Sequence, residues 1–274
     1  MPLFQGKPLN VSKPSLHFSH ANGFPAPCYA AMLGALRRRY RVSHLDTIGT
    51  DPRYPVTDRW PHLVAQLIDT IEREHHGAPV LGVGHSLGGY LNFMAATARP
   101  DLFRAIVMLD APVIGAVRGR LLEATKRLGI VDRVTPAAMT RDRRSAWSDA
   151  AEAKAHFRSR RLFSRFTEEC LDSYVQHALV EDRGGLRLLI PPALEYAIYC
   201  TIPHDMGRYV GSLRVPAGFI GGARSDVVER VGLAAMHGKF QLRSVPGGHL
   251  FPFEHPHEAA QAVENLLETL APGK

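Results

Sequence analysis

One short motif in this sequence offers a serine nucleophile. Residues 84–88 read GHSLG, the pattern G-x-S-x-G, and they lie between an apolar run at 79–83 and a stretch to Ala98 with few helix breakers. A strand that turns sharply into a helix at a serine needs glycine neighbours, because the turn leaves no room for side chains. The helix N-terminus would present N–H groups to negative charge on a carbonyl under attack. The motif therefore predicts Ser86 as the nucleophile of an acyl transfer.

A serine hydroxyl at neutral pH needs a base within hydrogen-bond reach, and that base needs an orienting acid. His249 follows the last expected strand on a glycine-flanked loop, so we predict it as the base. Asp226 ends the turn after the preceding strand, in the chain order serine, acid, histidine. We favour Asp226 as the acid over Asp110, which ends an earlier strand at the same edge of the sheet and could be a turn residue.

Stabilising an oxyanion takes two backbone N–H groups that point at the developing charge. Leu87 supplies one as the residue after the nucleophile, and Phe24 is the candidate for the other in the loop after the first parallel strand. Asn22, His85 and His204 are candidate pocket residues. His255-Pro256-His257-Glu258 has the composition of a metal site but reads as a helix start, so we expect no metal.

The elements that must position these residues alternate between strands and helices, which predicts a mostly parallel sheet of the doubly wound α/β class. The expected strands are 15–18, 41–45, 79–83, 104–110, 215–220 and 240–245. The expected helices are 30–39, about 63–75, 87–98, 227–236 and 256–270. Residues 1–14, with three prolines, suggest an irregular arm or a short edge hairpin.

The alternation stops between residues 113 and 209, where helical periodicity dominates and only 186–190 could be extended. We expect a helical cap there, inserted before the strands that carry the acid and the histidine. The core would then comprise 1–112 and 210–274. The cap would cover the carboxyl edge of the sheet, where Ser86 must lie.

Together these residues resemble the α/β-hydrolase fold superfamily, and in particular its capped, esterase-like serine hydrolases. The motifs that carry the resemblance are Gly23-Phe24-Pro25, Asp46-x-x-Gly49, and residues 84–89, 221–226 and 248–249. It implies the roles already given to Ser86, Asp226, His249, Phe24 and Leu87, and no cofactor. Asn22 stands where the family's oxyanion loop usually has histidine, with His20 two residues earlier. The usual antiparallel hairpin before the first parallel strand is expected to be shortened or absent.

The resemblance implies hydrolysis of small or medium carboxylic esters. A serine at position 86 argues against haloalkane dehalogenases and epoxide hydrolases, which use aspartate there. Thioester, lactone or C–C bond hydrolysis and cofactor-free perhydrolysis remain open with the same triad. A different class also remains open, a ligand-binding or signalling protein with little turnover.

Composition sets the remaining limits. The chain has 274 residues, 45% of them apolar, a formal charge of +7 and no run of about 20 apolar residues that could span a membrane. The polar N-terminus does not resemble a signal peptide, so we expect a cytoplasmic protein without a membrane partner. Basic clusters at 141–144 and 158–161 have acids nearby and read as solvated helix faces, not a nucleic-acid site, although they could steer acidic substrates. Three widely spaced cysteines argue against a disulfide framework or a zinc site. Oligomeric state is not predicted.

Overall fold

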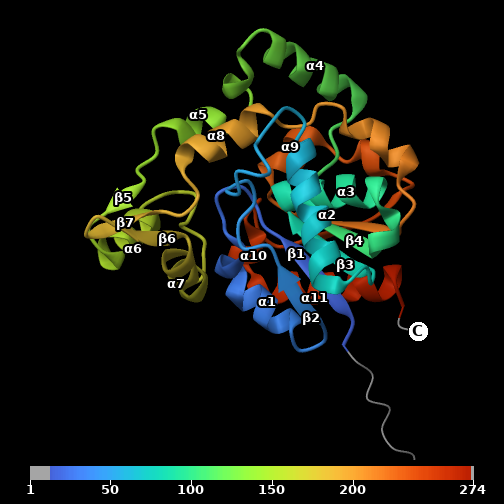
Figure 1. Ribbon diagram of the computed structural model, residues 1–274, viewed down its shortest axis with the longest axis horizontal. Coiled ribbons are helices and arrows are strands. Elements are labelled where there is room, and N and C mark those ends of the chain that lie inside the picture. Colours follow the sequence, from blue (N-terminus) through green and yellow to red (C-terminus); the bar gives the residue numbers. More distant parts are fainter. Residues whose placement is uncertain (1–12, 273–274) are drawn as a thin grey trace, which may run out of the picture.

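The computed structural model describes residues 13–272. Most of the arm expected over residues 1–14 lies outside this range. Within it, the chain forms a parallel sheet with helices on both faces and an insert at one edge (Figure 1). None of the described helices combines the length and apolar character that crossing a membrane requires.

The central sheet has six strands in the order β2-β1-β3-β4-β8-β9, and every neighbouring pair is parallel. The strands are β1 (Ser15–Ser19), β2 (Arg41–His44), β3 (Val80–His85), β4 (Phe103–Leu109), β8 (Ala217–Gly222) and β9 (Phe240–Val245). Residues of β3 and β8 are buried throughout, as expected for central strands covered on both faces. The predicted α/β class and the approximate strand positions are confirmed.

Helices cover both faces of this sheet. One face carries α1 and α11, whose apolar residues join one core cluster, and the other carries α2 and α3, which join a second. The core helices are α1 (Ala30–Leu36), α2 (Pro61–His75), α3 (Leu87–Ala98), α9 (Asp226–Val231), α10 (Phe251–Glu254) and α11 (Pro256–Leu270). The sheet order reverses beside β1 and β3, and ligands bind at such a point in open α/β sheets.

The insert between β4 and β8 is only partly helical. Its helices are α4 (Ala116–Arg127), α5 (Ala137–Arg141), α6 (Ala150–Arg158), α7 (Glu168–His177) and α8 (Pro192–Cys200). Three short strands, β5 (Ala146–Trp147), β6 (Leu179–Asp182) and β7 (Gly185–Leu188), form a second, antiparallel sheet. Arg183 and Gly184 both have positive φ, the conformation of a two-residue hairpin turn between β6 and β7. Strand β7 overlaps the 186–190 stretch, so the extended alternative considered for that stretch is partly correct.

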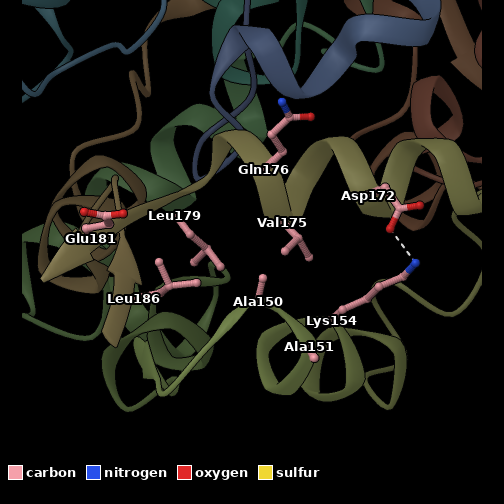
Figure 2. A pocket seen from close by; sticks show the side chains of 9 residues that line it. All are labelled: Ala150, Ala151, Lys154, Asp172, Val175, Gln176, Leu179, Glu181 and Leu186. Atoms are coloured by element: carbon pink, nitrogen blue, oxygen red, sulfur yellow. Dashed lines mark ion pairs between the residues drawn. The ribbon is translucent and has the colours of Figure 1, made fainter. Parts of the chain in front are cut away.

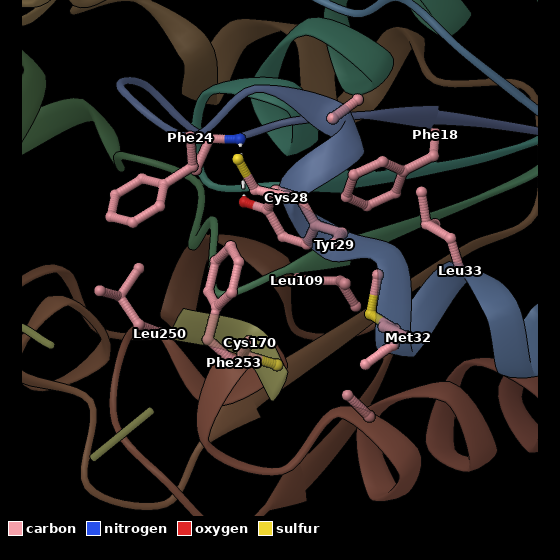
Figure 3. Close-up of a cluster of buried hydrophobic side chains, with 14 of the residues drawn as sticks. Phe18, Phe24, Cys28, Tyr29, Met32, Leu33, Leu109, Cys170, Leu250 and Phe253 are labelled. Atoms are coloured by element: carbon pink, nitrogen blue, oxygen red, sulfur yellow. Dashed lines mark hydrogen bonds between the residues drawn. The ribbon is translucent and has the colours of Figure 1, made fainter. Parts of the chain in front are cut away.

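Aromatic side chains join the insert to the core. Phe24 packs against Tyr174 of α7 with 5.3 Å between ring centroids, and Phe166 stacks on Phe253 at 4.7 Å. Figure 3 shows Phe24, Tyr29 and Phe253 together with the buried free thiols of Cys28 and Cys170. Such aromatic contacts add to the hydrophobic gain, so the α7 side of the insert is anchored beside the loop that follows β1.

Candidate active site

Ser86 lies at the sharp turn between β3 and α3. Its backbone has φ 50° and ψ −114°, a strained conformation for a residue with a side chain. A Cβ on Gly84 would lie 2.3 Å from the Gly88 carbonyl carbon, and one on Gly88 would lie 2.1 Å from the Ser19 carbonyl oxygen. Both glycines are therefore required by contact, as the motif predicts, and the half-buried Ser86 is held at the carboxyl edge of the sheet.

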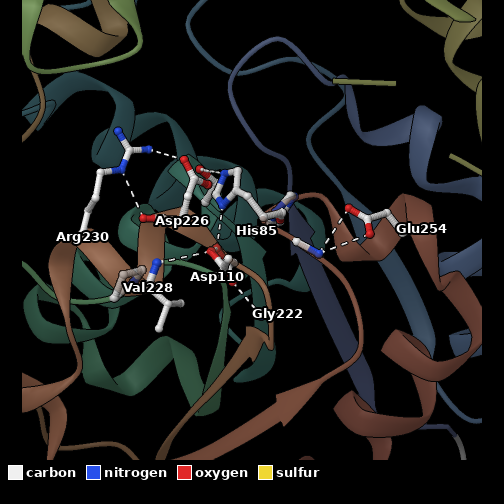
Figure 4. Close-up of polar contacts among 12 residues, drawn as sticks. His85, Asp110, Gly222, Asp226, Val228, Arg230 and Glu254 are labelled. Carbon is white, nitrogen blue, oxygen red and sulfur yellow. Dashed lines mark hydrogen bonds and ion pairs between the residues drawn. The ribbon is translucent and has the colours of Figure 1, made fainter. Parts of the chain in front are cut away.

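His249 lies next to this serine. Its Nε2 is 3.2 Å from Ser86 Oγ, and its Nδ1 is 2.7 Å from Asp110 Oδ2. An imidazole Nδ1–H that donates to the carboxylate leaves Nε2 free to accept from the serine hydroxyl. The loop before His249 is fixed because the Gly248 N–H donates to both oxygens of Glu254 at 3.2 Å (Figure 4). The structure thus brings Ser86 and His249 together.

The expectation that Asp226 meets the histidine is wrong. Asp226 is the first residue of α9, its side chain is mostly exposed, and it pairs with Arg230 at 2.6 Å (Figure 4). No hydrogen bond or ion pair between Asp226 and His249 occurs in residues 13–272, whereas Asp110, the competing candidate, makes this contact. Helix geometry explains the difference, because a side chain in the first turn of an exposed helix faces solvent and pairs with the residue four positions later.

Asp110 is completely buried, and two further donors besides His249 hold its carboxylate. The Gly222 N–H donates to Oδ1 at 2.8 Å, and the Ser225 hydroxyl donates to Oδ2. Its backbone has φ 45°, so the chain turns abruptly at the end of β4 and directs the carboxylate along the sheet edge. Hydrogen bonds from the last residue of β8 and from the turn after it satisfy a buried carboxylate that would otherwise be costly.

The two backbone amides expected to face an oxyanion have different surroundings. Ser86 N–H donates to Leu109 O and Gly88 N–H donates to His20 O, while no loop or turn hydrogen bond in the described residues uses the Leu87 N–H between them. Phe24 N–H donates to Ala21 O at 3.1 Å and closes a turn around Gly23. The Leu87 N–H is therefore available as a donor. The Phe24 N–H could donate to an oxyanion only by sharing or breaking its hydrogen bond to Ala21 O.

Comparison with known proteins fits this geometry. The profile of the alpha/beta hydrolase family matches residues 18–262, most of the chain. The chain belongs to the alpha/beta hydrolase family. Its fold is similar to that of E-2-(acetamidomethylene)succinate hydrolase (TM-score 0.75, 20% identity, 94% of this chain and 92% of that one). It is also similar to a thermophilic esterase from Thermogutta terrifontis (TM-score 0.64, 18% identity, 95% and 91%). The Abhydrolase domain-containing protein AFT2-1 of Alternaria alternata is 24% identical over 232 residues, 69% of this chain and 83% of that protein.

In this α/β-hydrolase a side chain of the insert forms a hydrogen bond with the peptide group between Gly23 and Phe24. The Tyr174 hydroxyl donates to Gly23 O at 3.3 Å and accepts from Arg143 Nη2 at 3.2 Å. Arg143 Nη1 in turn donates to both carboxylate oxygens of Glu195 at 2.9 Å. A trans peptide group points its C=O and N–H in opposite directions, so anchoring Gly23 O fixes where the Phe24 N–H points.

The hydrogen-bonded chain from Glu195 through Arg143 to Tyr174 is shielded from solvent. Glu195 is 3% exposed and Tyr174 is fully buried. Burial raises the pKa of the Glu195 carboxyl, a rise that Arg143 partly offsets, and raises that of Tyr174 to about 12, so the phenol keeps its proton for Gly23. Sequence reasoning missed these residues, because it assigned Arg143 to a solvated basic cluster and had no signal that Glu195 would face it.

Asn22 and His85 support the site through hydrogen bonds to neighbouring loops. Asn22 Nδ2 donates to the Glu195 carbonyl at 3.0 Å, which ties the turn to α8. His85 Nε2 lies 2.9 Å from the His249 carbonyl and must donate to it, so Nδ1 accepts from the Tyr29 hydroxyl at 2.8 Å. That hydroxyl also accepts from the Ala21 N–H at 3.2 Å. Burial, and then the nearby His249, hold the pKa of His85 well below its usual value.

His204 lies elsewhere. It lines a cavity of about 310 Å³ with Gly119, Glu123 and neighbouring residues of α4, and Ser86 is not among the lining residues. A larger cavity of about 560 Å³ lies within the insert between α6, α7 and the small sheet, where Lys154 and Asp172 face each other (Figure 2). Its lining also contains none of the candidate site residues. No contact in the described chain therefore connects His204, expected as a candidate pocket residue, with Ser86 or His249.

His17, Glu74 and His75 place one potential metal ligand each within 4.8 Å of one another. The Ser43 hydroxyl lies between them, 3.0 Å from His17 Nδ1 and 2.8 Å from His75 Nε2. The other nitrogen of each ring is buried without a hydrogen-bond partner in the described residues. A metal ligand normally donates that second N–H to a partner, so these contacts fit a hydrogen-bonded cluster around Ser43 better than a metal site.

Proposed function

We propose that the protein is a serine hydrolase that cleaves small or medium carboxylic esters through an acyl-enzyme on Ser86. The observation that carries the proposal is the continuous line from Ser86 Oγ through the ring of His249 to Asp110, with distances of 3.2 and 2.7 Å. The strained turn at Ser86 supports it, because the turn presents the hydroxyl at the end of a buried strand.

In this mechanism His249 Nε2 takes the proton of Ser86 as Oγ attacks the ester carbonyl. The imidazolium that forms is stabilised by Asp110, which holds Nδ1–H and stays ionised. His249 then returns the proton to the leaving alcohol, and the acyl group remains on Ser86. Water, deprotonated by the same nitrogen, attacks the acyl-enzyme and releases the carboxylic acid.

The oxyanion of each tetrahedral intermediate would accept hydrogen bonds from the Leu87 and Phe24 amides. Leu87 N–H begins α3, so the helix dipole adds to its donor strength. The Gly23 and Phe24 peptide group is held from the other side by Tyr174. We therefore assign Tyr174, Arg143 and Glu195 as positioning residues of the second oxyanion donor.

The test is turnover of a series of p-nitrophenyl esters of increasing acyl length by the full chain and by Ser86→Ala. We expect release of p-nitrophenol by the natural protein and its loss in the variant, with the preferred acyl length measuring the acyl pocket. Equal turnover by both proteins would overturn the assignment of Ser86. Absence of turnover across the whole series would overturn the ester substrate class.

A further inference from the structure

Apolar side chains are exposed on one part of the insert. Six large hydrophobic residues are strongly exposed in residues 13–272, and five of them lie between Val117 and Met139. Val117, Leu121 and Leu128 are 74%, 64% and 71% exposed, and Met139 is 80% exposed. Clusters of exposed apolar side chains mark interaction surfaces more often than single ones do. We call residues 116–141, which comprise α4 and α5, the α4 segment.

Helix α4 carries its apolar stripe on the outside. Val117, Leu121, Ala124 and Leu128 follow the spacing i, i+4, i+7, i+11 and share one exposed face. The opposite face packs on the protein, since a Cβ on Gly119 would lie 2.0 Å from His204 O. This orientation is the reverse of the usual surface helix, whose apolar face is directed inward.

Lys126 confirms that the inner face of α4 is polar. Its ammonium group donates to Ile202 O at 2.6 Å and pairs with Asp58, so it lies against the core. In Figure 1, α4 lies at the outer edge of the insert, away from the central sheet. The apolar stripe is therefore available to a partner outside the chain.

The charge around this stripe is positive. The α4 segment contains six basic and two acidic residues, a formal charge of +4 out of +7 for the chain, and only Lys126 among the six is turned to the inner face and paired with Asp58. Both acids are engaged within the segment, Glu123 with Arg127 at 2.6 Å and Asp132 with Arg141 at 2.8 Å. Arg118 and Arg120 are exposed on the two sides of the stripe. An apolar helical face bordered by arginine is the pattern of helices that lie in the surface of an anionic membrane.

We propose that the α4 segment is a docking surface for anionic lipid membranes, with Val117, Leu121 and Leu128 entering the interface and the arginines contacting lipid headgroups. Charge favours this occupant over a second copy of the chain. In a two-fold contact through the stripe, arginines would face arginines, and both acids of the segment are already paired. The proposal is independent of the chemistry at Ser86, and it replaces the expectation, drawn from the sequence, that the protein has no membrane partner.

The experiment measures binding of the full chain to vesicles of phosphatidylcholine alone and of phosphatidylcholine mixed with phosphatidylglycerol, by co-sedimentation. We expect binding to the mixed vesicles that weakens at high salt. Arg118→Gln/Arg120→Gln should weaken it about fivefold for each arginine removed. Val117→Ser/Leu121→Ser/Leu128→Ser should weaken it about tenfold or more, because the apolar contribution is lost.

Arg160→Gln/Arg161→Gln/Leu162→Ser is the matched control, since these residues combine two exposed arginines with an exposed leucine elsewhere in the insert. It should bind as the natural protein does, and all three variants should keep the circular dichroism spectrum of the natural protein. Equal loss in the control and the α4 variants, or no preference for phosphatidylglycerol, would overturn the proposal. The proposal would also be overturned if the protein did not bind vesicles and instead formed a dimer that Val117→Ser/Leu121→Ser/Leu128→Ser dissociates.

Discussion

The carboxylate of Asp110 lies 2.7 Å from Nδ1 of His249, although 139 residues and the whole insert separate them in sequence. The two residues follow β4 and β9, and β8 lies between these strands in the sheet. The carboxyl end of β8 connects the two, because the N–H of its last residue, Gly222, and the hydroxyl of Ser225 in the turn that follows both donate to Asp110. Asp110 therefore follows β4, its two further donors come from the end of β8 and the turn after it, and the histidine that it orients follows β9.

Replacing Asp110 with asparagine should nearly abolish turnover. An amide in place of the carboxylate favours the wrong imidazole tautomer and no longer stabilises the imidazolium, so we expect kcat to fall about 10³ to 10⁴-fold. Asp226→Asn is the matched control and should change kcat less than about twofold, because an exposed ion pair contributes little. Steady-state kinetics on a p-nitrophenyl ester distinguish the two. The reverse ranking would contradict the placement of the acid.

The sequence could predict the strand ends that carry Ser86, His249 and both candidate acids, because apolar runs locate strands and parallel strands share a carboxyl edge. It could not decide between the acids. That decision depends on the positive φ at Asp110 and on donors from the turn after β8, neither of which has a periodic signal. The chain order serine, acid, histidine fits Asp110 as well as Asp226.

Tyr174→Phe should lower kcat about tenfold and leave KM within about twofold, because the hydroxyl orients an amide whose hydrogen bond strengthens in the transition state. The phenyl ring keeps its packing against Phe24, so the variant should still fold, with a loss of about 1–3 kcal/mol in the free energy of unfolding because Gly23 O and Arg143 Nη2 each lose a hydrogen-bond partner. Tyr196→Phe is the control, since its hydroxyl bonds to Arg141 and Asp132 away from Gly23. An unchanged kcat in Tyr174→Phe would show that the hydroxyl does not position Phe24.

Tyr29→Phe should destabilise the fold. Its hydroxyl accepts from the Ala21 N–H and donates to His85 Nδ1, and the variant leaves both buried groups unpaired. An unpaired buried polar group costs about 1–3 kcal/mol, so we expect a loss of about 2–4 kcal/mol in the free energy of unfolding in urea. Unchanged stability would indicate that these bonds contribute nothing net.

Acidification should destabilise the protein through its buried histidines. Burial lowers the pKa of His17 to about 3 and that of His20 to about 4, from an ordinary value of 6.5. Below about pH 6.5 the unfolded chain binds protons that the folded chain does not, so stability falls as the pH drops toward about 4. Each such histidine contributes about 1.4 kcal/mol per pH unit to this slope.

The test of this slope is urea unfolding across that pH range for the natural protein and for His17→Asn. The amide can replace Nδ1 against the Ser43 hydroxyl but does not titrate. We expect the variant's slope to be lower by about 1.4 kcal/mol per pH unit. Parallel slopes for the two proteins would mean that His17 is not held neutral by the fold.

The insert was less predictable than the core. Helical periodicity predicted a stretch of helices over residues 113–209 without their bounds, and strands as short as β5 have too few residues for a period to appear. The partners of Arg143 lie 31 and 52 residues away, so a local charge pattern could only suggest a solvated face. The small antiparallel sheet and the burial of Arg143 both depend on contacts between segments that are distant in sequence.

The most direct test of the central claim is the site of covalent labelling by a fluorophosphonate, read by peptide mass spectrometry. We predict a single phosphonyl adduct on Ser86 in the natural protein, no adduct at that peptide in Ser86→Ala, and much slower labelling in Asp110→Asn. An unlabelled Ser86 in the natural protein, or labelling of Asp110→Asn at the natural rate, would contradict the account of Ser86, His249 and Asp110 as one catalytic unit.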